Sequence, residues 1–150
     1  MLSKKSKYAI KALLALARNA KEENFMRISQ ISEEEHIPRK FLEAILVDLK
    51  KQGFLKSKLG ANGGYFLAKP ADQIVLSQIM RLTDGPIALL PCVSLNYYER
   101  CDDCDDEVSC GIRKMALQIR DASLEILNNT TIADLLAKEK KGASRKGKKK

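Results

Sequence analysis

The hydrophobic pattern changes twice within the first 70 residues, and this change constrains the fold more than any other feature of the chain. Residues 7–18, YAIKALLALARN, are almost continuously apolar, which predicts a helix buried on most sides. Residues 29–37 predict a short second helix, and residues 39–52 a third, amphipathic one. Residues 54–70 then read as two short strands around the glycine-rich segment GANGG. This order predicts a mainly α winged helix-turn-helix domain with a small β-hairpin wing.

Two more helices are expected after the hairpin, at residues 76–83 and 111–128. The later helix carries one apolar stripe, formed by Ile112, Met115, Ala116, Ile119, Ala122, Ile126 and Leu127. Such a stripe needs a partner. Pairing with the same helix of a second subunit is the favoured interpretation, and docking on its own domain is the alternative.

These patterns divide the chain into four parts. Residues 1–86 are expected to form the winged helix-turn-helix domain, and residues 87–110 a loop that bears the cysteines. Residues 111–137 are expected to form the long dimerisation helix and a C-terminal helical turn. Residues 138–150, KEKKGASRKGKKK, show no apolar periodicity and are interpreted as a disordered basic tail.

The net charge of +8 is distributed unevenly along the chain. Residues 1–60 sum to +6, residues 61–137 to −5 and residues 138–150 to +7. A basic tail binds any polyanion, so it says little about specificity. The informative charge is therefore the excess in the first 60 residues, where a folded surface is expected.

Several classes of protein are disfavoured by what the sequence contains. It has no run of 18 apolar residues, which predicts no membrane partner, and its cysteines are confined to residues 92–110. These features predict a cytoplasmic protein. His36 is the only histidine, and there is no phosphate-binding loop with its lysine and no nucleophile beside an orienting base. We therefore expect a protein that is not an enzyme.

In a winged helix the second helix of the turn motif lies in the major groove, and its first residues reach the base edges. Here these residues are Arg39, Lys40 and Glu43. Arg39 or Lys40 could donate hydrogen bonds to guanine, and Glu43 could accept one from cytosine. The alternative is an ordinary solvated helix face. The pattern places three lysines ahead of the first helix, Lys4, Lys5 and Lys7, and these are candidates for phosphate contacts.

The hairpin supplies the second candidate DNA contact. Its tip combines residues that tolerate positive φ or leave the backbone bare, and lysines lie on its stem. A plain turn would need only two residues, so a longer bare tip favours a wing pressed against DNA. The tip residues are Gly60, Asn62, Gly63 and Gly64, and the stem lysines are Lys56 and Lys58.

Four cysteines form a single cluster, Cys92, Cys101, Cys104 and Cys110, with the spacing C-x8-C-x2-C-x5-C. Four thiolates can ligate a 2Fe–2S or 4Fe–4S iron–sulfur cluster, or a tetrahedral zinc ion. The spacing alone does not distinguish these metal centres.

From Leu2 to Leu136 the chain resembles the Rrf2 family of bacterial transcriptional regulators, which includes an iron–sulfur cluster regulator and a nitric-oxide-sensing repressor. The segments that carry the resemblance are SKKSKYAIKALLALA, IPRKFLEAILVDLKKQGFLKS, GANGGYFLAKP, LTDGPI, the cysteine loop and LNNTTIADLL. The resemblance implies a homodimer built on residues 111–128, with each cysteine loop near the partner's DNA-binding domain. It also implies that the state of a cluster tunes the affinity for the operator.

The resemblance also implies a ligand set. Cys92, Cys104 and Cys110 match the three cysteines that many members use, so Cys101 is extra. Arg113 stands where some members place a histidine ligand. Other members take a ligand from the first helix, where this chain has Tyr8 and Ala12. An all-cysteine site is the simplest proposal, although some members of the family have no cluster.

Three hypotheses follow. The first is a transcriptional regulator, most simply a repressor, that binds double-stranded DNA with an inverted-repeat operator and is controlled by an iron–sulfur cluster or by cysteine oxidation. The second keeps the winged helix but assigns the cysteines to zinc or to a thiol–disulfide switch. The third, from another class, is an electron-transfer or protein-interaction module without specific DNA binding.

Overall fold

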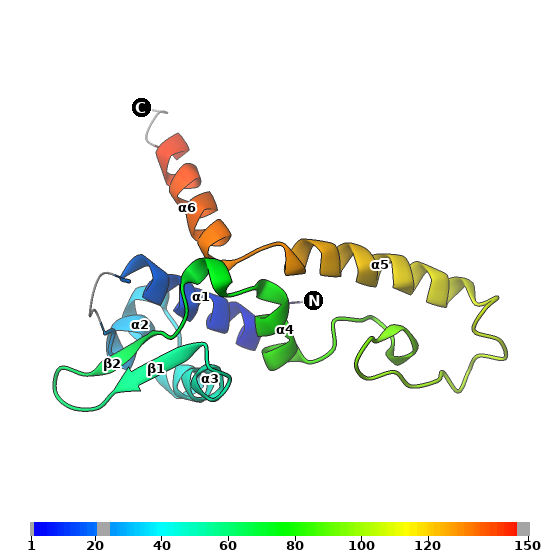
Figure 1. Ribbon diagram of the computed structural model, residues 1–150, viewed down its shortest axis with the longest axis horizontal. Helices are drawn as coiled ribbons and strands as arrows, with labels where there is room; N and C mark the ends of the chain where they lie inside the picture. The colour runs from blue at the N-terminus through cyan, green and yellow to red at the C-terminus, as the bar shows by residue number, and fades with distance from the viewer. Residues whose placement is uncertain (1, 21–24, 147–150) are drawn as a thin grey trace.

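The computed structural model describes residues 2–20 and 25–146, with side chains as far as residue 142, and shows helices packed around a two-stranded hairpin (Figure 1). A compact group of helices lies at one end, and one long helix extends away from it (Figure 1). In chain order the elements are α1 (Lys4–Arg18), α2 (Ile28–Glu35), α3 (Arg39–Lys51), β1 (Leu55–Lys58), β2 (Gly64–Leu67), the 3-10 turn Ala71–Gln73, α4 (Leu76–Asp84), the 3-10 turn Pro91–Val93, α5 (Gly111–Asn128) and α6 (Ile132–Lys146).

Helix α1 is the centre of the compact group, as its apolar sequence predicts. It packs against α2, α3, α4, α6 and β2. Its side chains include small alanines, which allow neighbouring helices to approach closely, and leucines that fill the space between them. The buried members are Ala9, Ala12, Leu13, Leu14, Ala15 and Leu16. The helix begins earlier than its apolar run because the Ser3 hydroxyl accepts a hydrogen bond from the Ser6 backbone N–H at 3.0 Å.

The turn between α2 and α3 is fixed by two backbone features. His36 ends α2 in the left-handed conformation, with φ of 54°, and Pro38 is the N-cap of α3 with φ of −57°. Between them the Ile37 side chain is buried in the core. This turn therefore orients the amphipathic helix α3 with its apolar face toward the core. The buried residues on that face are Leu42, Ile45, Leu46 and Leu49.

The hairpin pairs β1 with β2 in antiparallel register, from Leu55 opposite Leu67 to Lys58 opposite Gly64. A further bridge joins Met26 to Tyr65, so the segment before α2 lies along the outer edge of β2. Gly63 and Gly64 are required by these contacts. A Cβ at Gly63 would clash with the Lys58 carbonyl, and one at Gly64 with the Met26 carbonyl. Their lack of a side chain therefore has an internal cause, in addition to any approach to DNA.

Helix α5 and residues 87–110 form an arm that extends from α4 (Figure 1). The loop runs along the helix and turns back at its far end, where the Cys110 side chain caps the first turn of α5. A small apolar cluster of Cys92, Val93 and Ala116 joins loop to helix. The fold class is confirmed as a mainly helical winged helix with a long additional helix.

Two expectations for the C-terminal part are wrong. Ile132 is fully buried in the core of the compact group and α6 packs on α1, so residues 131–137 belong with the winged helix rather than with α5. Residues 138–146, expected to be disordered, continue α6. The physical reason is that an established helix is easily extended by Lys, Glu and Ala, and Arg18 pairs with Glu139 at 2.8 Å. Residues 147–150 of the expected tail lie outside the described residues.

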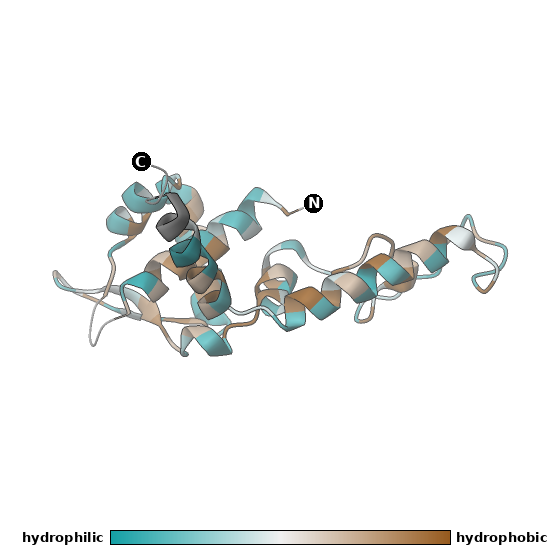
Figure 2. Ribbon diagram, turned by 90° about the horizontal axis from the view of Figure 1, so that it is seen from above, coloured by the Kyte–Doolittle hydropathy of each residue, from teal (hydrophilic) through white to brown (hydrophobic). Residues whose placement is uncertain are grey.

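Hydropathy varies around α5 as well as along it, with brown and teal faces alternating on the helix (Figure 2). Among the described residues, no helix is long and apolar enough to cross a membrane.

Candidate DNA interface and cysteine loop

The outward face of α3 carries the residues that the sequence predicts at base edges. Arg39, Lys40 and Glu43 are all exposed. The Arg39 Nε lies 3.2 Å from a Glu43 carboxylate oxygen, so this pair stabilises one turn of the helix in the free protein. The Arg39 side chain is 67% exposed and the Glu43 side chain 48% exposed, so either can exchange this partner for a base.

The lysines near the N-terminus lie elsewhere than expected. Because Ser3 caps α1, Lys4, Lys5 and Lys7 belong to its first two turns instead of preceding the helix. Lys4 and Lys7 are exposed, whereas the Lys5 ammonium pairs with Asp48 of α3 at 2.9 Å. Lys5 therefore joins two helices, whereas Lys4 and Lys7 form no ion pair with an acidic side chain among the described residues.

The hairpin presents a basic surface beside α3. Lys56 and Lys58 are exposed on β1, and the Lys58 ammonium lies 5.3 Å from the centre of the Phe25 ring. At the tip, Gly60 has φ of 108°, a conformation that side chains disfavour, and Asn62 is exposed.

The four cysteines, all within the described residues, form no disulfide. Cys92 is buried, whereas Cys101, Cys104 and Cys110 are half-buried. Cys104 and Cys110 lie together: burial raises the pKa of the Cys104 thiol, and its hydrogen bond with Cys110 raises it further. The Arg113 backbone N–H, 3.4 Å from the Cys110 sulfur, lowers the pKa of the Cys110 thiol. The Cys110 thiol is therefore more readily ionised than the neighbouring Cys104 thiol.

The chemistry of the donors fits a metal centre, and two of the thiols, Cys104 and Cys110, are joined by a hydrogen bond. Among residues 2–20 and 25–146, no three cysteine, histidine or acidic side chains are gathered as ligands. Arg113, at the position where the resemblance suggested a histidine, has its Nε 3.6 Å from a Glu107 oxygen. The same carboxylate accepts a hydrogen bond from the Tyr98 hydroxyl at 2.6 Å, which raises the pKa of Tyr98.

Helix α5 has two apolar faces instead of the single stripe expected. Ala116, Leu117, Leu124 and Leu127 turn toward the rest of the chain and are buried or half-buried. The other face is exposed and follows the alternating three- and four-residue spacing of a coiled-coil seam: Ile112, Met115, Ile119, Ala122 and Ile126. Beside it lies a hollow of about 350 Å³ whose lining includes Leu2, Leu89 and Ile119.

The sequence model of the Rrf2 family, described as an iron-dependent transcriptional regulator, matches residues 2–138. The chain belongs to the Rrf2 family. It is 42% identical over 139 residues to an rrf2-like HTH-type transcriptional regulator of Rhodobacter capsulatus, with 91% of this chain and 93% of the relative covered. The relatives are transcriptional regulators rather than enzymes, in agreement with the expectation from sequence.

Two solved structures of Rrf2 regulators are similar over most of the chain. CymR of B. subtilis, a global cysteine regulator, has a TM-score of 0.74 at 28% identity and covers 91% of this chain and 96% of its own. IscR of T. potens has a TM-score of 0.71 at 26% identity and covers 93% of this chain and 88% of its own. The resemblance inferred from the sequence is confirmed.

One basic residue of this Rrf2 winged helix, Arg27, was not predicted from the sequence. The Arg27 guanidinium donates to the Ala61 carbonyl and so ties the wing tip to the start of α2. Arg27 is separated from the wing by more than 30 residues, and only the bridge between Met26 and Tyr65 brings it there. The isolated pair Phe25–Met26 between polar residues is the one signal in the sequence for this added edge.

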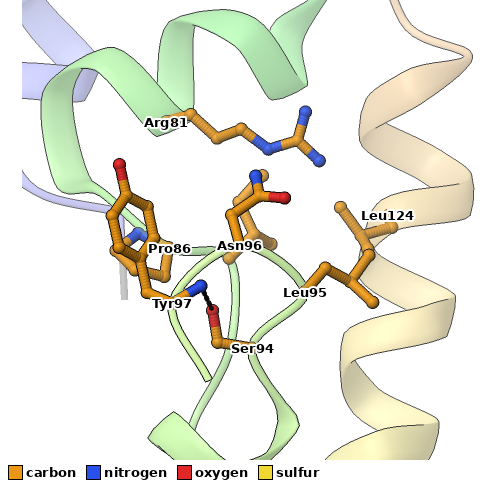
Figure 3. Close-up of a pocket in the computed structure, with 8 residues that line it drawn as sticks. Arg81, Pro86, Ser94, Leu95, Asn96, Tyr97 and Leu124 are labelled. Carbon is orange, nitrogen blue, oxygen red and sulfur yellow. Dashed lines mark hydrogen bonds between the residues drawn. The ribbon is translucent and has the colours of Figure 1, made fainter. Parts of the chain in front are cut away.

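A small cavity lies where the cysteine loop meets α4 and α5 (Figure 3). Arg81 extends across it above Asn96, Leu124 closes it from α5, and the Tyr97 N–H donates to the Ser94 hydroxyl at 3.1 Å. Its volume of about 80 Å³ is well below that of typical small-molecule pockets, about 300–1,000 Å³. In this Rrf2 chain the basic surface of α3 and the hairpin, the cysteine loop and the exposed face of α5 are thus better candidates for function than this cavity.

Proposed function

We propose that this chain is a dimeric repressor that binds an inverted-repeat operator, with α3 in the major groove and the hairpin against the backbone. The observation that carries the proposal is the position of the exposed basic residues. These residues are Lys40 on α3 and Lys56 and Lys58 on β1, two elements that pack against each other. Lys4 and Lys7 of α1, Asn62 and Gly60 of the tip are further candidates for backbone contacts.

The dimer is proposed to form through the exposed face of α5. Exposure of these large apolar side chains to water is unfavourable, and a second copy of the same helix would cover them. They are Ile112, Met115, Ile119 and Ile126. A two-fold dimer would also place two α3 helices on DNA, which favours half-sites about one helical turn apart, roughly 10 bp.

A first experiment tests DNA binding. Operator duplexes are selected from a random library, and binding is titrated with salt for the parent and two variants. Arg39→Ala is expected to lose about 1–3 kcal/mol of discrimination at one base pair per half-site. Lys58→Ala is expected to weaken binding to all duplexes alike and to lower the salt slope by about one per lysine. Equal affinity of the parent for selected and scrambled duplexes near physiological salt would overturn the proposal.

The cysteine loop is proposed to control the affinity for DNA by holding an iron–sulfur cluster, 2Fe–2S or 4Fe–4S, on Cys92, Cys101, Cys104 and Cys110. A bound cluster would supply a redox- and oxygen-sensitive centre. The chain itself contributes four thiols, and the Arg113 N–H that stabilises ionised Cys110. Because no three ligands are gathered among the described residues, the loop would have to rearrange to hold a cluster on all four thiols. Cys110 caps α5, so this rearrangement would couple cluster occupancy to the position of α5.

The test is purification without oxygen, followed by visible and electron-resonance spectra with iron and sulfide counts. Cys92→Ala, Cys104→Ala and Cys110→Ala are expected to abolish stable cluster retention, whereas Cys101→Ala shows whether another ligand can replace that thiol. Full occupancy in all four variants would exclude this loop as the cluster site. Colourless protein with stoichiometric zinc would favour a zinc site instead.

The proximity of Cys104 and Cys110 favours a second candidate, a thiol–disulfide switch. The ionised Cys110 sulfur attacks a low-molecular-weight disulfide and releases its thiolate half; Cys104, on losing its proton, then displaces the other half. One disulfide forms in the protein and one is reduced. A solved structure of Staphylococcus aureus CymR, similar with a TM-score of 0.69, is described as an oxidized form. Mass spectrometry of peptides after oxidised-glutathione treatment tests the candidate, which fails if Cys104 and Cys110 stay unlinked.

A further inference from the structure

A single line of residues runs along the side of α3 that faces away from the core. Lys40, Ala44, Val47 and Lys51 are spaced by four, three and four residues, so they lie one above another on the helix surface. All of them are exposed, and Leu42, Leu46 and Leu49 are buried on the opposite side. The middle of this line is therefore apolar, with a lysine at each end.

The two apolar residues on this line do not serve the fold. Val47 is 43% exposed, and neither it nor Ala44 belongs to the buried core or to the residues packed against it. Phe41 is also exposed, but it lies to one side, where its ring meets the Tyr8 ring edge-on at 6.3 Å. Phe41 thus has an internal partner, whereas Ala44 and Val47 have none among the described core residues.

The major groove offers few partners to such a surface. The edges of guanine, cytosine and adenine present hydrogen-bond donors and acceptors, which alanine and valine cannot satisfy. Thymine alone adds an apolar group, the C5 methyl. A hydrogen-bonding base edge held against Val47 would lose its bound water without gaining a hydrogen-bond partner. The apolar surface therefore also disfavours binding to the other bases at this position.

We propose that Ala44 and Val47 read thymine C5 methyl groups, so that T·A pairs occupy the part of each half-site that faces the middle of α3. This inference rests on the proposed binding of α3 in the major groove. Arg39 and Glu43 supply hydrogen-bonding readout at the start of the helix. Lys40 contacts phosphates or neighbouring bases on one side, and Lys51 contacts phosphates on the other. The apolar middle thus determines a feature of the operator that charge cannot.

The experiment removes the methyl group and nothing else. Duplexes selected by the parent from a random library are remade with deoxyuridine in place of thymidine, one position at a time, and affinities are measured at fixed salt. One thymidine or two per half-site are expected to be sensitive, each losing about fourfold in affinity, the value for burial of one apolar carbon. A 5-methylcytosine at the same position, against guanine, is expected to bind better than cytosine.

A double-mutant cycle then assigns the methyl to its reader. In Val47→Ala, which keeps a good helix former at an exposed position, the loss on removing the methyl is expected to fall below about twofold. Ala44→Ser tests the neighbouring position in the same way. Lys51→Ala is the matched control on the same line: it should weaken the thymidine and deoxyuridine duplexes equally, because a phosphate contact is blind to the methyl.

The outcomes separate this inference from the proposal on which it rests. If the parent selects a defined operator but tolerates deoxyuridine at every position, DNA recognition stands and thymine readout fails. An equal methyl effect in the parent, Val47→Ala and Ala44→Ser would also overturn it. If the parent selects no operator, the proposed function itself fails. Circular dichroism confirms that each variant is folded before its affinity is compared.

Discussion

Helices α1 and α5 are both rich in apolar residues, but they differ in how much of that apolar surface the chain buries. α1, with 15 residues, buries Ser6 and six apolar side chains, whereas the 18-residue α5 buries only Ala116 and Leu124. The first lies at the centre of a core that the chain completes by itself, and the second lies on a narrow arm. A regular apolar spacing therefore shows that a helix needs a partner, and only packing shows whether the chain supplies it.

The largest effect is expected in the compact group. Leu46 is fully buried at the centre of the core, so Leu46→Ala should reduce the free energy of unfolding by about 2–5 kcal/mol. Leu95→Ala is the matched control, because Leu95 is 63% exposed on the arm and should change stability by less than about 0.5 kcal/mol. Urea unfolding measures both. Equal losses would show that Leu95 on the arm contributes to stability as strongly as Leu46 of α3 does in the core.

The next effect tests whether α5 meets a second copy. Ile119→Glu would place a charge in the proposed seam of each helix and should weaken dimerisation by about 2–4 kcal/mol, which leaves monomer at micromolar concentration. Gln118→Glu adds the same charge one residue away, outside the seam, and should leave the dimer intact. Light scattering measures the mass in solution. An intact dimer of the Ile119 variant would place the interface elsewhere.

A smaller effect is expected at the ion pairs between α1 and α2 in the compact group. Glu35 is nearly buried, and its carboxylate pairs with Arg18 and lies 3.5 Å from the Lys11 ammonium. Since both basic partners are about one-third exposed, Glu35→Gln should cost only about 1–2 kcal/mol of unfolding free energy. Glu34→Gln, on an exposed position of α2, is the control. A loss of equal size in both variants would assign the effect to overall charge.

The smallest effect concerns the start of α6. Thr131 accepts a hydrogen bond from the Asp134 N–H at 3.2 Å, and Asp134 accepts one from the Thr131 N–H at 2.8 Å. Thr131→Ala should cost about 1 kcal/mol of unfolding free energy in thermal or urea unfolding. An unchanged unfolding free energy in Thr131→Ala would mean that packing of Ile132 alone holds α6 on the core.

The same capping box predicts a pH dependence. The Thr131 hydroxyl and N–H lower the pKa of the Asp134 carboxyl. Stability from this cap is therefore fully present above the unfolded pKa, about 3.9, and is lost as the pH falls through the lower folded value. Asp134→Asn should flatten that part of the stability profile, measured by unfolding between pH 5 and 2. A profile identical to that of the parent would remove Asp134 as its source.

Much of the fold follows from local patterns in the sequence. The apolar run of α1, the amphipathic spacing of α3, the glycine-tipped hairpin and the full span of α5 were all predicted, because each depends on the periodicity of neighbouring residues. The family was predicted as well. The DNA-contact and cysteine-site assignments stay predictions.

Other features depend on residues that are far apart in the chain, and the sequence did not determine them. The pairing of Lys5 with Asp48, the tie from Arg27 to the wing and the clash with Met26 that demands Gly64 all arise when distant segments meet. The length of α6 depends on Arg18, more than 100 residues earlier. By itself, the sequence determined which residues are apolar and at what period; the tertiary structure decided which of those faces the chain covers, because burial is a property of neighbours and not of a residue's own position in the chain.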